Sequence, residues 1–149
     1  MPKLCGYALC NSVARDDEAH PTAINVFASI SVGGSEAIPV NALSQRSWQI
    51  LTMWQVDLEE RTQSYEQVCL VSLPDGTAFG GGRIAISPTM SSHNLSMKVT
   101  GIPIGQVGLI TVKVWLEQDG KKVTEEHSTW ISVEHLPREK KVEGIAQDV

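Results

Sequence analysis

The stretch from Gly108 to Glu134 constrains the fold of this chain more strongly than any other. Two runs in which apolar and polar residues alternate lie on either side of Asp119-Gly120. An Asp-Gly pair supplies the positive φ angles of a two-residue hairpin turn, and alternation with period two is typical of a strand with one buried face. This stretch is therefore predicted to be an antiparallel β-hairpin.

The turn also predicts the register of the hairpin. Pairing outward from Asp119-Gly120 sets Glu117 opposite Lys122. Farther along, the same register sets Lys113 opposite Glu126. Opposite-charge pairs of this kind modestly stabilise an antiparallel ladder, so the charges and the turn indicate the same pairing.

Strand-like segments recur along the rest of the chain about every 8–12 residues, a spacing typical of β-sandwiches. They span Leu4–Ala14, Thr22–Val32, Ser47–Glu60, Tyr65–Leu73, Thr77–Ser87 and Leu95–Thr100. With the hairpin they make about eight antiparallel strands, which predicts an all-β, single-domain β-sandwich. The segment 47–60 keeps a helical alternative, because apolar Leu51 and Met53 interrupt its polar face.

Length and charge limit the class of protein further. The 149 residues suffice for one domain, which we assign to residues 1–136, followed by a charged tail at 137–149 that is frayed or docked on a neighbour. The net charge is −5 and the basic residues are dispersed, which argues against a nucleic-acid-binding surface. No apolar run approaches the roughly 20 residues of a membrane-spanning helix.

The cysteines indicate the compartment. Cys5, Cys10 and Cys69 cannot all pair within one chain, and the odd spacing of the first two points them to opposite faces of one strand. Free thiols in a reducing environment are therefore expected. The N-terminal apolar run is too short for the core of a signal peptide, so we predict a cytoplasmic protein.

The order of segments resembles an uncharacterised bacterial family of short immunoglobulin-like β-sandwich proteins. The residues that carry the resemblance are Ile24–Ile30 (INVFASI), Tyr65–Gly76 (YEQVCLVSLPDG), Met97–Gly120 and Trp130–Glu134. The chain departs from the family pattern at Ala28-Ser29, where acidic and polar residues are expected, and by an insertion around residues 33–47. The resemblance implies an immunoglobulin-like fold and no activity.

The sequence contains no catalytic motif. The glycine run Gly80-Gly81-Gly82 is followed by a strand pattern rather than by the helix that a phosphate-binding loop requires, so a bulge, a bent edge strand or a close backbone approach explains it better. The four histidines lack metal-ligand spacing, and no cofactor or metal is predicted. The acidic group at 57–66 is interpreted as a solvated loop, with a divalent-ion site as its alternative.

Both faces of the hairpin carry unusual residues. The core-directed face includes Glu125, His127 and Thr129, so this part of the last strand should be exposed, bulged or paired with a partner. The opposite, polar face carries Trp115 and Trp130. Each tryptophan belongs to a contact surface or is covered by the N-terminal segment or the C-terminal tail.

Three hypotheses for the function follow. The first is a non-enzymatic protein-interaction or structural module, self-associating as a homo-oligomer, with Leu109, Trp115, Trp130, Glu125 and His127 as interface residues. The second is a sandwich that binds a small ligand or a carbohydrate by stacking on Trp115 or Trp130. The third is a hydrolase or metal-dependent enzyme whose site forms near Glu125 and His127.

Overall fold

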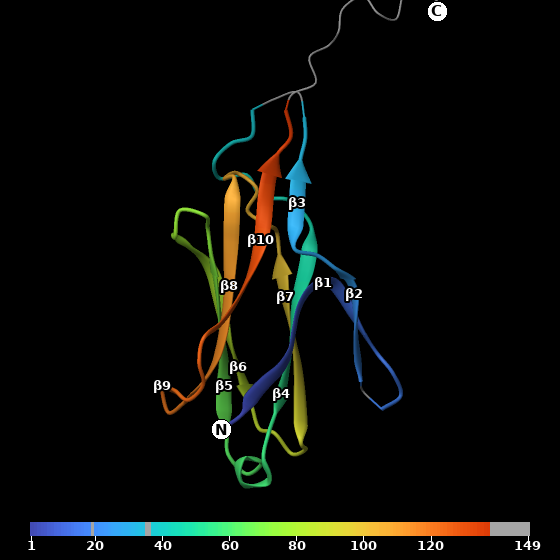
Figure 1. The fold of residues 1–149 in the computed structure, drawn as a ribbon, viewed down its shortest axis with the longest axis vertical. Coiled ribbons are helices and arrows are strands. Elements are labelled where there is room, and N and C mark those ends of the chain that lie inside the picture. The colour runs from blue at the N-terminus through green and yellow to red at the C-terminus, as the bar shows by residue number, and fades with distance from the viewer. Residues whose placement is uncertain (19, 35–36, 138–149) are drawn as a thin grey trace, which may run out of the picture.

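The computed structural model describes residues 1–18, 20–34 and 37–137, and these contain ten strands and no α-helix (Figure 1). The strands are β1 (Lys3–Arg15), β2 (Pro21–Val26), β3 (Ser29–Val32), β4 (Ser47–Gln55), β5 (Tyr65–Ser72), β6 (Ala78–Ile86), β7 (Ser92–Thr100), β8 (Gly108–Gln118), β9 (Lys121–Lys122) and β10 (His127–His135). One 3-10 turn, η1 (Leu58–Glu60), follows β4. Apart from Pro137, the predicted C-terminal tail lies outside the described residues.

The strands form two sheets that pack face to face, as Figure 1 shows. The first sheet has the order β2-β1-β4-β7 and the second the order β3-β10-β8-β5-β6, with β9 also paired to β8. The prediction of an all-β, two-sheet sandwich is confirmed. About eight strands were expected, and the described residues contain ten, because two of the predicted strands are each divided in two.

The predicted strand at 22–32 is divided at Phe27 into β2 and β3, which belong to different sheets. Asn25 has a φ of 55°, a left-handed conformation that bends the backbone just before the crossing. The Phe27 ring then meets the Trp48 ring edge-on at 6.1 Å, and the Arg46 guanidinium lies 4.5 Å from the ring centroid of Phe27. After these contacts of Phe27, β3 belongs to the second sheet and pairs with β10 in parallel. Only antiparallel pairs had been expected.

The segment from Ser47 is a strand, and the helical alternative is wrong. Trp48, Ile50 and Trp54 are fully buried on the face of β4 that meets the second sheet. Their spacing of two is that of an extended chain, in which successive side chains point to opposite faces. The strand stops at Gln55, and η1 follows it.

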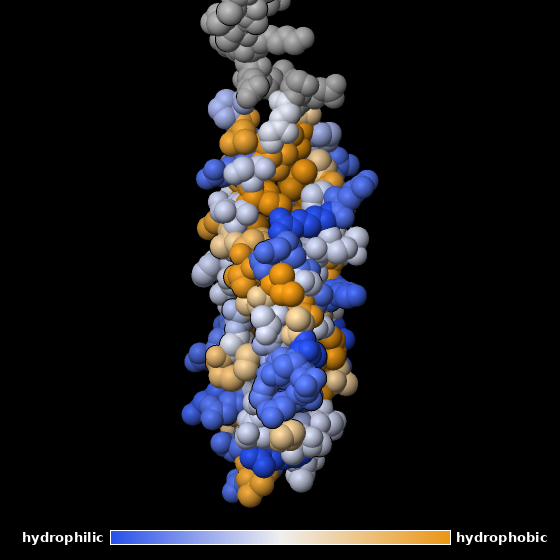
Figure 2. All heavy atoms as spheres, turned by 90° about the vertical axis from the view of Figure 1, so that its right-hand side faces the viewer, coloured by the Kyte–Doolittle hydropathy of each residue, from blue (hydrophilic) through white to orange (hydrophobic). Residues whose placement is uncertain are grey.

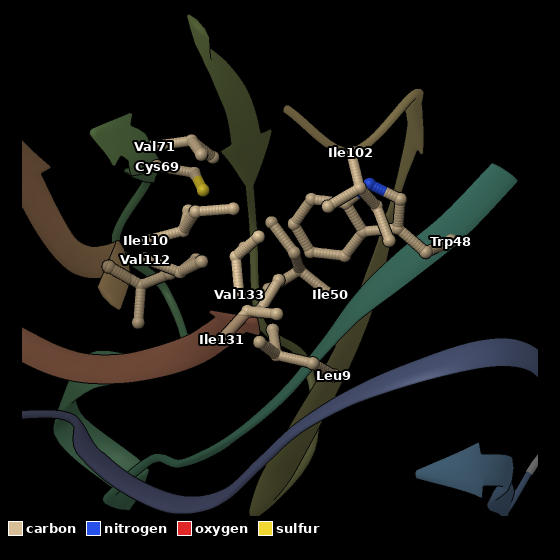
Figure 3. Packing of buried hydrophobic residues seen from close by; sticks show 11 residues of the cluster. Leu9, Trp48, Ile50, Cys69, Val71, Ile102, Ile110, Val112, Ile131 and Val133 are labelled. Carbon is tan, nitrogen blue, oxygen red and sulfur yellow. The ribbon is translucent and has the colours of Figure 1, made fainter. Parts of the chain in front are cut away.

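Apolar side chains from both sheets fill the space between them (Figure 3). Trp48, Ile50 and Leu9 come from the first sheet and lie against Val71, Ile110, Val112, Ile131 and Val133 of the second. The Tyr7 hydroxyl crosses between the sheets and donates a 2.9 Å hydrogen bond to the Val112 carbonyl oxygen. Burial of these apolar groups is the main force that holds two such sheets together.

A polar junction lies inside this core. The Gln67 side chain projects from β5 and its Oε1 accepts hydrogen bonds from Thr52 Oγ1 at 2.6 Å and from Trp54 Nε1 at 2.7 Å. All three residues are fully buried. Because β4 and β5 belong to different sheets, this amide joins the two sheets through satisfied buried polar groups.

Apolar groups are also exposed away from the hairpin. Figure 2 views the side of the molecule on which β2 lies, and apolar atoms gather in the upper half of that view. Val26, at the end of β2, is exposed. Exposure alone therefore does not set Trp130 and Leu109 apart; they differ from Val26 in lying on the paired strands β8 and β10.

Candidate functional site

The turn of the β8–β9 hairpin forms as the sequence predicts. Glu117 pairs with Lys122 and Gln118 with Lys121. Asp119 and Gly120 have φ angles of 52° and 78°, so both central residues of the turn are left-handed. Two positive φ angles in succession are characteristic of a type I′ turn, whose twist matches that of the flanking strands.

Beyond the turn, the register differs from the predicted one by two residues. Lys113 pairs with Ser128, whereas the sequence set it opposite Glu126. Residues 123–126 leave the ladder, and the Thr124 hydroxyl accepts a 2.9 Å hydrogen bond from the Leu116 amide in place of a strand carbonyl. Because the shift is two residues rather than one, the side chains of the paired residues 127–133 keep their predicted faces. Lys113 Nζ still lies 3.6 Å from Glu126 Oε2.

The residues that leave the ladder, 123–126, explain how the polar side chains predicted on the core-directed face at 125–129 are accommodated. Glu125 lies between β9 and β10 and is exposed, so its charge is not buried. His127 pairs with Val114 and not with Val112, and its ring meets the Trp54 ring edge-on at 6.1 Å. The bulge that the sequence allowed is thus the feature that keeps Glu125 out of the core.

Trp130 and Leu109 lie next to each other on the outer face of the second sheet. Trp130 pairs with Thr111, and Leu109 pairs with Ser132, so the two are diagonal neighbours rather than directly opposite as predicted. Diagonal neighbours on one face of an antiparallel pair lie about 7–8 Å apart, within reach of an indole. Trp130 is 49% exposed and Leu109 is 52% exposed.

Trp115 is covered by residues of its own hairpin, whereas the alternative to a contact surface had named the N-terminal segment or the tail as its cover. It is only 8% exposed. Its Nε1 donates a 3.0 Å hydrogen bond to Glu117 Oε1, and Lys122 Nζ lies 4.6 Å from its ring centroid. A cation over an indole face is a favourable arrangement. Trp115 therefore offers little surface to a partner, which argues against a role for it in an interface.

A chain of charges surrounds Trp115. Arg83 NH1 lies 2.7 Å from Glu117 Oε2 and 2.6 Å from Glu66 Oε1. The hydrogen bond from Trp115, together with Arg83, holds the pKa of Glu117 below its usual value. The hydrogen bonds that Arg83 donates to Glu66 and Glu117 raise the pKa of Arg83. These contacts stabilise the charged forms of Arg83 and Glu117, and neither group then has the neutral form needed for proton transfer near neutral pH.

The glycine run lies in β6, at one edge of the second sheet. A Cβ atom on Gly81 would lie 2.6 Å from the Cys69 carbonyl oxygen, so β5 and β6 approach each other too closely for any other residue. The expected close backbone approach is confirmed, and β7 rather than a helix follows. This run is structural and does not bind phosphate through a helix N-terminus.

The remaining candidates are dispersed. Glu60 is buried, where its Oε2 accepts a 3.0 Å hydrogen bond from the Asp57 amide and it also contacts the N-terminal ammonium group, so part of the acidic group caps η1. His20 bonds Asp16, and a nitrogen of the His135 ring lies 2.7 Å from the Ile104 carbonyl oxygen. Within residues 1–18, 20–34 and 37–137, no three His, Cys, Asp or Glu side chains are grouped as a metal site requires.

The three cysteines are all free, as expected, with Cys5 exposed and the other two buried. No helix in the described part of the chain has the length and apolar character to cross a membrane. In the comparisons with known proteins, no family model matches the chain and no curated protein is significantly similar to it.

Proposed function

We propose that the chain is a non-enzymatic protein-interaction module of the cytoplasm that self-associates through the outer face of the β8–β10 hairpin. The observation that carries this proposal is the pair Trp130 and Leu109, two large apolar side chains that are half exposed and adjacent on regular strands. Strands hold such side chains in place, so binding costs little further ordering. Tryptophan is also the residue most enriched at the centres of protein interfaces.

The charges on this face favour a second copy of the chain as the partner. Lys113 lies at one end of the paired stretch of β8 and β10, opposite Ser128, and exposed Glu134 lies at the other end. A two-fold axis perpendicular to the strands would set the Lys113 end of one copy against the Glu134 end of the other. Both ion pairs would then form at once around the apolar centre, as the self-complementary interface of a two-fold dimer requires.

We further propose that the sandwich is immunoglobulin-like. The neighbours β1-β4-β7 in one sheet and β10-β8-β5-β6 in the other correspond to the A-B-E and G-F-C-C′ neighbours of that fold. The β2 strand and the parallel β3–β10 pair are additions at the other edge of each sheet. The cytoplasmic assignment rests on the three free thiols.

Light scattering coupled to size-exclusion chromatography over a range of concentrations tests self-association. The wild type is expected to dimerise, and Trp130→Ala is expected to weaken the dimer about 30-fold, the effect of losing one interface hot spot. The matched control is Val26→Ser, which removes an exposed apolar side chain from β2. A monomer at every concentration, or equal weakening by Val26→Ser, would contradict the proposal.

The second candidate function, binding of a carbohydrate or another small ligand by stacking, uses the same exposed indole. Because Trp115 is covered, Trp130 is the tryptophan of this face that a sugar ring would meet. Titration of the intrinsic fluorescence with a panel of glycans distinguishes the two functions. A fluorescence change that the wild type shows and Trp130→Ala lacks would support sugar binding as the function in place of self-association.

A further inference from the structure

A cavity of about 240 Å³ opens between the edge strands β6 and β7, on the opposite edge of the sandwich from β2 and β3. Its lining includes the buried side chains of Ile50, Cys69 and Val71 and the half-buried side chains of Phe79, Met97 and Val99. Figure 3 shows Ile50, Cys69 and Val71 pointing into the space between the sheets. Lys98 and Thr100, which are exposed, also belong to the lining, so the cavity reaches solvent.

Two inward-facing glycines create the cavity. In the β5–β6 ladder, Gly80 pairs with Val71 and Gly82 pairs with Cys69. Residues that pair directly share a face, and both partners on β5 belong to the core. Any other residue at position 80 or 82 would therefore direct a side chain into the space between the sheets. The cavity is the volume that those side chains would have filled.

The two glycines differ in what their missing side chains would meet. A Cβ on Gly82 would lie 2.9 Å from the Met97 methyl group, so close packing against β7 accounts for that position. A Cβ on Gly80 would meet nothing within 4 Å. Packing does not require glycine at position 80, and the effect of glycine there is to leave the cavity open.

The chemistry of the lining favours an apolar guest. The core-facing side chains of its lining are aliphatic, aromatic or sulfur-containing, and Lys98 and Thr100 are exposed residues of β7 that alternate with Met97 and Val99. Burial raises the pKa of Cys69 to about 11, so the thiol is neutral at physiological pH and adds no charge. A protein cavity of about 150 Å³ with a similar apolar lining binds benzene, a molecule of six heavy atoms. By that ratio, this cavity accommodates a molecule of about ten heavy atoms.

We propose that the cavity between β6 and β7 is a binding site for a small apolar molecule of about ten heavy atoms, such as a bicyclic aromatic compound or a short acyl chain. The apolar body lies against Ile50, Cys69 and Val71, and any polar end stays at the opening near Lys98 and Thr100. This site is separate from the hairpin face and does not depend on self-association.

Indole and octanoate are suitable probes because both have nearly the required size. Isothermal titration of the full chain is expected to give dissociation constants of roughly 10–500 µM, in line with the affinity that ligands of this size reach. Gly80→Val fills the cavity from the open position and is expected to weaken binding at least tenfold. The matched control is Ala85→Val, on the outward face of the same strand, opposite Glu66, which should bind as the wild type does.

The thiol on the cavity wall supplies an independent readout. In a Cys5→Ser variant, which lacks the exposed thiol, modification of Cys69 by a small apolar thiol reagent is followed by mass spectrometry. Saturating probe is expected to slow this modification severalfold, whereas modification of Cys10, which lies outside the cavity lining, should not change.

Absence of heat and of Cys69 protection with both probes would overturn the proposal, as would equal binding by Gly80→Val and the wild type. Unfolding curves identify a Gly80→Val protein that fails to fold, and in that case Cys69 protection in the Cys5→Ser variant decides the question. Trp130→Ala should leave probe binding unchanged, so the outcome here is distinguishable from failure of the self-association proposed above.

Discussion

The amide of Gln67 joins the two sheets inside the core, and its replacement by leucine should destabilise the protein by about 1–4 kcal/mol. Thr52 Oγ1 and Trp54 Nε1 both donate to Gln67 Oε1, and all three residues are fully buried. In Gln67→Leu, both donors lose their acceptor in a place that water does not reach. The sequence offers no signal for this contact, because Gln67 is a polar residue within an ordinary strand pattern.

The magnitude follows from the two orphaned donors. Each buried donor without a partner costs about 1–3 kcal/mol, or about 2–6 kcal/mol for the pair. Burial of a leucine in place of an amide returns about 1–2 kcal/mol. The remainder is a large share of the 5–15 kcal/mol that typically stabilises a domain.

Urea unfolding monitored by circular dichroism measures the effect. A triple variant, Thr52→Val with Trp54→Phe and Gln67→Leu, provides the decisive comparison, because it removes the donors together with the acceptor. It should recover at least half of the loss, since replacement of both partners by apolar groups of similar shape is nearly neutral apart from the smaller ring. A loss below about 1 kcal/mol in Gln67→Leu, the net value of one ordinary hydrogen bond, would refute the reasoning, as would a triple variant less stable than the single one.

Two further predictions concern the second sheet. The pKa of Glu117 is lowered in the folded state by Trp115 and Arg83, so the stability it contributes is present at neutral pH and is lost as the pH falls through its folded pKa. Glu117→Gln should therefore flatten the decline of the urea midpoint between pH 7 and the acidic range; an unchanged slope would show that the carboxylate does not contribute. Gly81→Ala should destabilise the protein, because the added Cβ would lie 2.6 Å from a backbone carbonyl oxygen of β5. Gly80→Ala should not, because its Cβ would meet nothing within 4 Å. Equal melting temperatures for the two variants would contradict this difference.

Much of the local structure could be predicted from residues close together in the chain. The Asp119-Gly120 turn requires only two left-handed residues, and both adopt them. The strand at β4 follows from the alternation around Trp48 and Trp54. The face of each paired hairpin residue outside the bulge at 123–126 was also predictable, because side chains alternate strictly along a strand and the bulge shifts the register by an even number.

The contacts of the candidate site were less accessible to sequence reasoning. The sequence identified Trp115 and Trp130 as equivalent, yet one is covered and the other is half exposed. The difference arises from Lys122 and Glu117, which the hairpin turn places beside the Trp115 ring. Among the described residues, no comparable cover lies over Trp130, which is half exposed. The glycine run gave no indication of a cavity, because the empty volume depends on what β7 places opposite Gly80.

The sequence by itself determined that the chain forms strands, where its turns lie and which face of each strand is apolar. These properties depend on φ and ψ preferences and on alternation with period two, which act over a few residues. The tertiary structure decided that residues 22–32 serve both sheets, that the last strand is shifted by two residues, and which tryptophan reaches solvent. The first outcome depends on the packing of Phe27 against Trp48. The other two depend on side-chain contacts across the hairpin, which involve Thr124, Glu117 and Lys122. Local preferences contain no information about such partners.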